Sequence, residues 1–192
     1  MNKAAKVLLD GGVALLPTDT VYGLCASPLF PNAVAKIFAL KNRPNSKNLP
    51  ILVADIKQIS ALGVIINARV NALLSSRFVP GALSMVLPIE NGPDWLVGRK
   101  EVALRIPDQP ALLTLLGQTG PLLATSANAS GETPPAEVAK ILSQLNGTPD
   151  IVVDNGPSQN QASTLIDCQH SPFSVLRRGA LNDEDLKEIQ AL

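Results

Sequence analysis

The strongest constraint on the fold of this chain is a change in the order of its apolar segments. Early in the chain, short apolar runs with the length of strands alternate with segments of helical spacing. Late in the chain, three strand-like runs follow one another with only turn-rich segments between them. Alternation favours parallel pairing, whereas consecutive strands imply some antiparallel pairing. We therefore predict an α/β fold around a twisted, mixed parallel and antiparallel sheet flanked by helices.

Breaking and capping residues set the expected boundaries of the elements. A glycine pair beginning at Gly11 ends the first helix, Pro44 stops the second, and Asp55 has the character of an N-cap. Asn182 and Asp185 form an acidic version of a capping signal for the last helix. The expected helices cover residues 3–10, 32–40, 55–62, 68–78, 109–116, 134–145 and the segment from 182 onward. The expected strands cover residues 13–17, 49–53, 83–89, 102–106, 122–125, 151–154, 163–167 and 174–177.

Length and composition favour a single domain that spans 1–192. An apolar share of 46% in 192 residues supplies a substantial core. Lys plus Arg and Asp plus Glu balance at 16 each, so the chain lacks the basic excess typical of nucleic-acid or membrane binding. Cys25 and Cys168 cannot form a disulfide framework, and neither a signal peptide nor an apolar run of roughly 20 residues occurs. We expect a cytoplasmic protein without a membrane segment.

Several common catalytic and binding motifs are missing from the sequence. His170 is the only histidine, so a Ser-His-Asp or Cys-His scheme would depend on one residue in a polar turn. Cys168 and His170 lack a second pair of ligands and make a poor zinc site, so no metal ligands are predicted. Cys25 is better explained as a small buried residue than as a nucleophile. Neither a Walker A loop nor a GxGxxG turn occurs, so a nucleotide would have to be bound by other groups.

Two loops are candidates for binding an anion. Lys41, Arg43 and Lys47 place three cations within seven residues, although a solvated charged loop would explain the same pattern. Ser126 and Asn128 belong to the small-residue loop ATSANASG before a predicted helix. Hydroxyl and backbone N–H groups at such a place can bind phosphate, or they can simply cap the helix.

Polar residues at the ends of other strands add further candidates. Arg105 interrupts the apolar run VALRIP, and a charge there needs a partner, a ligand or a way out to water. Ser163 and Thr164 begin one late strand, and Arg177 and Arg178 end the next. Arginine presents a planar fork to phosphate or carboxylate, although arginines at a strand end are commonly only exposed.

Taken together, these segments resemble one known family over nearly the whole chain. YrdC-like (TsaC-type) threonylcarbamoyl-AMP synthases carry motifs similar to the following, in the same order: LLPTDTVYGL, KNRPNSKNLPILV, PGALSMVL with VALRIPDQP, ATSANASG, STLID and VLRRGA. The length is similar to that of the short form of the family, which lacks an extra C-terminal domain. The resemblance implies a twisted mixed sheet with a deep, positively lined concave cavity that holds ATP and threonine together.

The resemblance also implies roles for individual residues. Thr20 and Arg105 match positions of the threonine site. Lys41 and Arg43 match a Lys-x-Arg pair used around the nucleotide phosphates, and they are the candidate catalytic residues. The full set matching nucleotide-contacting positions is Lys41, Arg43, Lys47, Ser126, Asn128, Ser163 and Arg177.

Two departures from the family pattern affect the predicted site. PGALS stands where many relatives have PGPLT, which suggests a contact through Ser84. Leu52 stands at about the place of a histidine that some longer relatives carry, and it cannot perform the function of that histidine.

The implied reaction requires no protein nucleophile. The threonine amine combines with CO2 or bicarbonate to give N-carboxy-threonine, whose carboxylate attacks the α-phosphate of ATP and expels pyrophosphate. Mg²⁺ is expected to accompany ATP, held mainly by phosphates and water because no carboxylate pair is evident. The implied product is used by downstream threonylcarbamoyl-transfer proteins to make N6-threonylcarbamoyladenosine in tRNA, and a weak tRNA contact would fit this role.

Two other functions compete with this interpretation. A double-stranded RNA-binding module could use a basic concave surface to dock a helix by shape, but a formal net charge of +0 argues against it. Carbamoyl transfer to another acceptor would keep the fold, but the YrdC-like domains that perform it work alongside other modules, which this sequence does not show.

Overall fold

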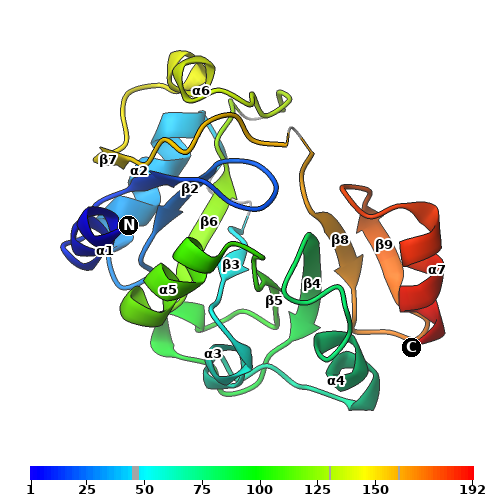
Figure 1. Cartoon of the computed structure of the whole chain (residues 1–192). Coiled ribbons are helices and arrows are strands. Elements are labelled where there is room, and N and C mark those ends of the chain that lie inside the picture. The colour runs from blue at the N-terminus through cyan, green and yellow to red at the C-terminus, as the bar shows by residue number, and fades with distance from the viewer. Residues whose placement is uncertain (45–47, 130, 160) are drawn as a thin grey trace.

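The computed structural model describes residues 1–44, 48–129, 131–159 and 161–192. In these residues nine strands form one sheet in the order β7-β1-β2-β6-β3-β5-β4-β8-β9 (Figure 1). In chain order the strands are β1 (Ala14–Leu16), β2 (Gly23–Ala26), β3 (Ile51–Leu52), β4 (Leu83–Pro88), β5 (Glu101–Arg105), β6 (Leu122–Ser126), β7 (Ile151–Val152), β8 (Thr164–Asp167) and β9 (Ser174–Arg177).

The sheet is mixed, as the order of apolar segments predicted. The pairs β1–β7, β3–β5 and β4–β8 run parallel, and the remaining neighbours run antiparallel. The late strands β8 and β9 form an antiparallel pair, which is the arrangement expected for strands that follow one another along the chain.

The helices connect and cover these strands. They are α1 (Asn2–Leu9), α2 (Pro31–Lys41), α3 (Ile56–Ala61), α4 (Ala68–Leu74), α5 (Pro110–Thr119), α6 (Val138–Gln144) and α7 (Asp183–Ala191), with a short 3₁₀ helix η1 (Asp94–Leu96). The predicted N-cap at Asp55 is confirmed, because its carboxylate accepts the N–H of Gln58 at 2.9 Å. Among the described helices, none is both long and apolar enough to cross a membrane.

The sequence prediction missed strand β2. This strand pairs with β1 in a hairpin that places Gly23 opposite Leu16. All four of its residues are buried, so the strand lacks the apolar and polar alternation that marks a half-exposed strand. The polar residues of the preceding segment TDT also made a strand directly after it hard to predict.

Two predicted helices were too long. Helix α4 ends at Leu74, because the Ser76 hydroxyl donates to the Leu73 carbonyl and accepts the N–H of Phe78, which replaces helical hydrogen bonds. Helix α6 begins only at Val138, since the Ala136 carbonyl accepts the N–H of Ser158 from a distant part of the chain.

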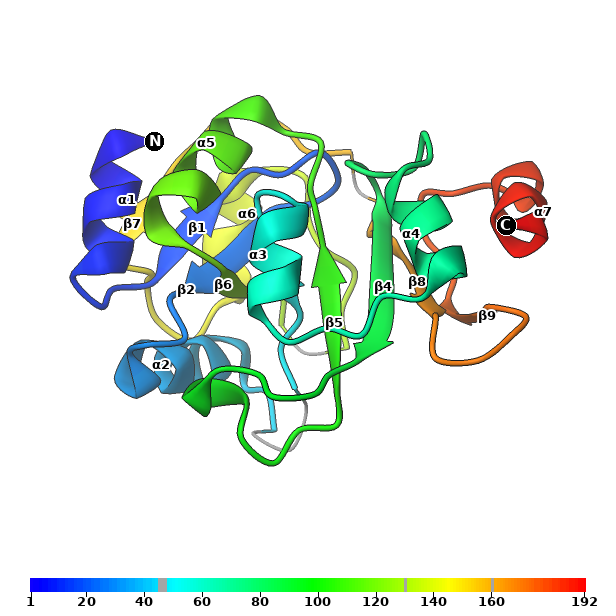
Figure 2. The same ribbon diagram turned by 90° about the horizontal axis from the view of Figure 1, so that it is seen from below.

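Two hydrophobic cores cover opposite faces of the sheet. The smaller core joins α1 and α5 to one face, where Ala14 and Leu16 point. Leu15, between them, points into the larger core with residues of α2, α3, α4 and α6. Figures 1 and 2 both show α1 and α7 at opposite ends of the molecule.

Neither cysteine has the properties of a nucleophile. Cys25 and Cys168 are buried, and burial is the main cause that raises the pKa of each thiol to about 12. Low reactivity is expected for thiols whose thiolate is disfavoured. His170 is exposed in a turn, as the sequence predicted.

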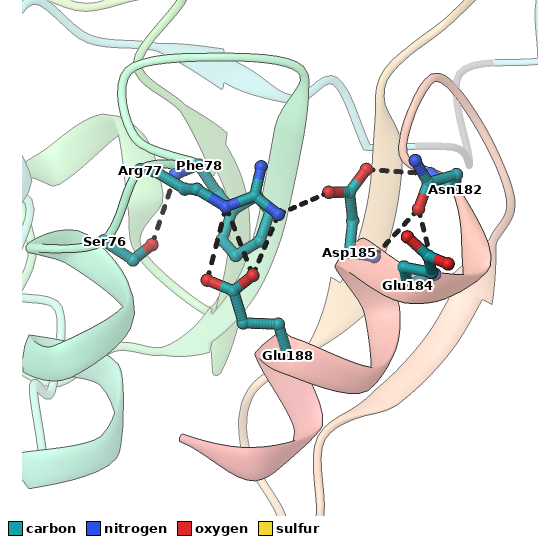
Figure 3. Close-up of polar contacts among 7 residues, drawn as sticks. All are labelled: Ser76, Arg77, Phe78, Asn182, Glu184, Asp185 and Glu188. Carbon is teal, nitrogen blue, oxygen red and sulfur yellow. Dashed lines mark hydrogen bonds and ion pairs between the residues drawn. The ribbon is translucent and has the colours of Figure 1, made fainter.

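Helix α7 is held against the rest of the molecule by charge and capping (Figure 3). The predicted capping box is present, since Asn182 accepts the N–H of Asp185 and the Asp185 carboxylate accepts the N–H of Asn182. Arg77, which follows α4, donates to Asp185 at 2.7 Å and to Glu188 at 2.8 Å. Leu186 and Ile189 complete the attachment by burying their side chains. These contacts fix the C-terminal helix that follows β9.

Candidate functional site

A cavity of about 180 Å³ opens on the sheet. Its wall comes from the turn after β1 and from residues of β3, β4, β5, β6, β8 and β9. Six of the residues predicted from the sequence line this cavity although they are far apart in the chain: Thr20, Arg43, Arg105, Ser126, Ser163 and Arg177.

The remaining predicted residues do not line the cavity wall. Lys41 and Asn128 are buried beside Ser126 and are absent from the cavity lining. Lys47 lies outside the described residues. The structure therefore brings together most of the predicted site and places two of its members behind the wall.

Arg105 lines the cavity and is held by several partners. Its Nε donates to the Gly81 carbonyl at 2.8 Å, and its Nη1 donates to the Thr20 hydroxyl at 2.7 Å. Its Nη2 lies 2.5 Å from Oδ1 of Asp19. Burial lowers the pKa of Arg105, whereas the negative charge of Asp19 opposes this effect. The sequence left open whether this charge has a partner, a ligand or a way out to water, and the structure shows that it has a partner in Asp19.

Asp19 was missed by the sequence analysis. The only signal for it is an acidic residue between two threonines in the segment TDT. The turn is fixed by Thr18, whose hydroxyl donates to the Val21 carbonyl at 2.7 Å and accepts the N–H of Thr20 at 3.0 Å. This geometry holds both Asp19 and Thr20 against Arg105.

Arg43 and Arg177 approach the cavity from other elements. Arg43 follows α2 and donates to the Asn48 carbonyl at 3.2 Å, while its buried Nε has no hydrogen-bond partner among the described residues. Arg177 ends β9 and donates from Nη2 to the carbonyl of Ser163 at 2.9 Å and to its hydroxyl at 3.2 Å. Burial lowers the pKa of both arginines. Neither forms an ion pair with a carboxylate within the described part of the chain.

Lys41 joins the basic loop to the loop after β6. The residue is only 2% exposed, and its Nζ donates to the Ser126 carbonyl and, at 3.4 Å, to Oδ1 of Asn128. The Asn128 amide in turn donates to the carbonyl of Glu132 at 2.7 Å. Burial, reinforced by the positive charge of Arg43, lowers the pKa of Lys41 to about 8. Among the described residues, Lys41 therefore hydrogen-bonds to the cavity wall only through the Ser126 carbonyl.

Ser163 occupies a crowded corner of the cavity. Its hydroxyl lies 2.8 Å from that of Ser84, which also lines the cavity and was noted in the sequence as a departure from the family pattern. A Cβ added to Gly179 would lie 2.4 Å from the carbonyl carbon of Ser163, so this position needs glycine for a close backbone approach. Arg178 points elsewhere and pairs with Asp183.

The described residues do not form a metal site. No group of three His, Cys, Asp or Glu side chains is arranged to hold an ion in this part of the structure. Asp19 is already paired with Arg105.

Comparisons with known proteins show the family to which the chain belongs. The sequence model of the Sua5/YciO/YrdC family, described as "Telomere recombination", matches residues 6–179. Threonylcarbamoyl-AMP synthase of Bacillus subtilis (strain 168) is 35% identical over 194 residues, which cover 97% of this chain and 55% of the relative. A putative threonylcarbamoyl-AMP synthase of Mycobacterium tuberculosis (strain CDC 1551 / Oshkosh) is 34% identical over 189 residues, covering 97% of this chain and 87% of the relative.

Solved structures share the fold. The crystal structure of Pyrococcus abyssi Sua5 complexed with L-threonine has a TM-score of 0.87 and 34% identity, and the match covers 97% of this chain and 56% of that one. Escherichia coli YciO has a TM-score of 0.84 at 24% identity, with 96% and 91% covered, and this likeness concerns the fold alone. The chain spans about half the length of the B. subtilis and P. abyssi proteins.

Proposed function

Because the chain belongs to the Sua5/YciO/YrdC family, we propose that it is an L-threonylcarbamoyladenylate synthase. It would convert ATP, L-threonine and bicarbonate into threonylcarbamoyl-AMP and pyrophosphate. The observation that carries this proposal is that three arginines line the cavity but differ in their charge partners. Arg105 pairs with the carboxylate of Asp19, whereas Arg43 and Arg177 have no carboxylate partner among the described ion pairs. Such a cavity suits an amino acid beside a polyphosphate.

The proposed reaction has two steps. The ammonium form of threonine and bicarbonate give the carbamate, with release of water and one proton. A carbamate oxygen then attacks the α-phosphorus of ATP while the bond to the bridging oxygen breaks and pyrophosphate leaves. The protein must align two anions and neutralise the charge that develops at phosphorus and on the leaving group, which requires positioning and electrostatics.

We assign the threonine carboxylate to Arg105 and a second polar contact to Thr20. Arg105 still has N–H donors besides those bonded to Gly81 and Thr20. A bidentate arginine–carboxylate pair is a strong and directional contact. Thr20 is 2% exposed, and its hydroxyl already accepts an Arg105 N–H, so it orients the guanidinium as well.

We assign ATP to the other walls of the cavity. Arg43, with its unpartnered Nε, and Arg177 would contact the phosphates. Lys41 would support them from behind the Ser126 carbonyl, and together with Arg43 it supplies the positive charge for catalysis. The full set of proposed ATP-site residues is Lys41, Arg43, Lys47, Ser126, Asn128, Ser163 and Arg177. Mg²⁺ would enter as its complex with ATP.

The cellular role follows from the product. Threonylcarbamoyl-AMP would pass to threonylcarbamoyl-transfer proteins that modify tRNA, and the enzyme would work in the cytoplasm with a weak tRNA contact at most. A formal net charge of +0 supports this limit on RNA binding.

Pyrophosphate release tests the proposal directly. The wild-type chain is incubated with Mg·ATP, with and without threonine and bicarbonate, and the adenylate is identified by mass spectrometry. Release that requires both additions is the expected result. Release without threonine, or transfer of the carbamoyl group to a different acceptor, would contradict the proposed function. Valine in place of threonine should fail if the site binds the substrate hydroxyl.

A further inference from the structure

Three arginines line the cavity, and their charge partners differ. Arg105 faces the carboxylate of Asp19 at 2.5 Å. Arg43 and Arg177 donate only to carbonyl and hydroxyl oxygens among the described contacts. Among the described residues, Arg105 is therefore charge-compensated, whereas Arg43 and Arg177 keep an unbalanced positive charge, and Arg177 lies near enough to Arg105 to help lower its pKa.

Asp19 contacts Arg105 but does not itself line the cavity. Its neighbours Thr18 and Thr20 line the cavity, whereas Asp19 is not part of the lining. The side chains of Asp19 and Arg105 are 14% and 7% exposed, so water screens this pair weakly. The charge of Asp19 and its hydrogen bonding, across 2.5 Å between Oδ1 and Nη2, both favour the charged form of Arg105 and oppose the lowering of its pKa by burial.

Hydrogen bonds on both sides of Asp19 hold the backbone of its turn. Thr18 bonds to both the Val21 carbonyl and the Thr20 N–H, and the Thr20 carbonyl accepts the N–H of Gln159 at 3.1 Å. The backbone that carries Asp19 is therefore fixed beside Arg105.

We propose that Asp19 is a positioning and specificity-determining residue, which fixes Arg105 for an amino-acid carboxylate and directs phosphate groups to Arg43 and Arg177. This inference rests on the proposed function, because it assumes that an amino acid and ATP share the cavity. An uncompensated buried arginine would attract the most highly charged anion present, which is a phosphate. With Asp19 in place, that anion meets a nearby negative charge at Arg105, whereas an amino acid brings its own ammonium group. Asp19 thus disfavours the wrong occupant.

The test compares Asp19→Asn with a matched control, Asp183→Asn, which removes the charge of an exposed Arg–Asp pair outside the cavity. Inorganic phosphate is the probe. It is titrated calorimetrically into each protein and also used as an inhibitor while threonine and ATP are varied in turn. In the wild type and in Asp183→Asn, phosphate should compete with ATP and not with threonine.

In Asp19→Asn, phosphate should bind about tenfold more tightly, because a nearby opposing charge has been removed. It should also become a competitive inhibitor against threonine. A loss of structure alone would lower activity without creating this competition. Phosphate that still competes with ATP alone in a folded Asp19→Asn variant would overturn the inference.

A second variant covers the case in which Asp19→Asn does not fold. Asp19→Glu keeps the charge and lengthens the side chain, so it should raise the threonine KM while phosphate continues to compete only with ATP. An unchanged threonine KM, or competition between phosphate and threonine in this variant, would also overturn the inference. Failure of the proposed function is separate, since it would appear as absent threonine-dependent pyrophosphate release in the wild type.

Discussion

Arg105 and Arg177 both line the cavity, but their surroundings differ. Arg105 is 5% exposed, bonded to Gly81 and Thr20, and balanced by Asp19. Arg177 belongs to an exposed edge strand and donates only to oxygens of Ser163. Burial lowers the pKa of both guanidinium groups, yet only one has a carboxylate partner. We therefore expect the preferred ligand of each arginine to depend on the charge already beside it.

The largest effect is expected at Arg105, whose charge is balanced by Asp19. Arg105→Ala should raise the threonine KM about a hundredfold, because each hydrogen bond to a charged group contributes about 1.5–3 kcal/mol. The ATP KM should change less. Steady-state kinetics at saturating concentrations of the second substrate measure both values. Since the variant leaves Asp19 unpaired, its thermal unfolding is measured alongside, and Arg105→Lys serves as a variant that retains the charge. An unchanged threonine KM would remove Arg105 from the threonine site.

The next largest effect is expected at Arg43, which lines the cavity and has no carboxylate partner among the described ion pairs. Arg43→Ala should reduce kcat/KM for ATP by about 1.5–3 kcal/mol of transition-state stabilisation, since it removes charge-assisted bonds to phosphate. The threonine KM should respond less than it does in Arg105→Ala. Wild-type kcat/KM for ATP in this variant would show that the proposed phosphate contact is wrong.

The pH dependence of stability tests the lowered pKa of Lys41. Its pKa in the folded protein is about 8, mainly because of burial, whereas an unfolded lysine titrates near 10.4. Between these values the unfolded chain holds more protons, so the free energy of unfolding should rise with pH. Relative to that of Lys41→Met, the free energy of unfolding of the wild type should increase by roughly 1 kcal/mol per pH unit in this window.

Urea unfolding at several pH values from 7 to about 10 measures this difference. The control is Lys140→Met on the surface of α6. The free energy of unfolding of this variant should change with pH as that of the wild type does. A constant difference between wild type and Lys41→Met would mean that Lys41 titrates normally.

The smallest effect is expected at Arg178. This residue pairs with Asp183 outside the cavity, while its neighbour Arg177 lines the cavity. Calorimetric titration of ATP should show weaker binding to Arg177→Ala and almost unchanged binding to Arg178→Ala, because an exposed ion pair contributes little. Equal losses in the two variants would contradict the assignment of opposite directions to these arginines.

Much of the fold could be predicted because its signals are local. The N-cap at Asp55 and the capping box at Asn182 depend on residues within one helical turn. Strand β2 could not be predicted in the same way, because a fully buried four-residue strand has no alternating pattern. Helix α6 begins late because of a bond between Ala136 and Ser158, which are distant in the sequence.

The sequence by itself determined the mixed sheet and the chemical types of most site residues. Short apolar runs, capping residues and a charge inside VALRIP act over a few positions, so they can be seen without coordinates. Only the tertiary structure decided which charges meet. Asp19 and Arg105 are separated by 86 positions in the chain, yet their side chains lie 2.5 Å apart. Electrostatic energy depends on distance in space and on burial, and the folded chain sets both.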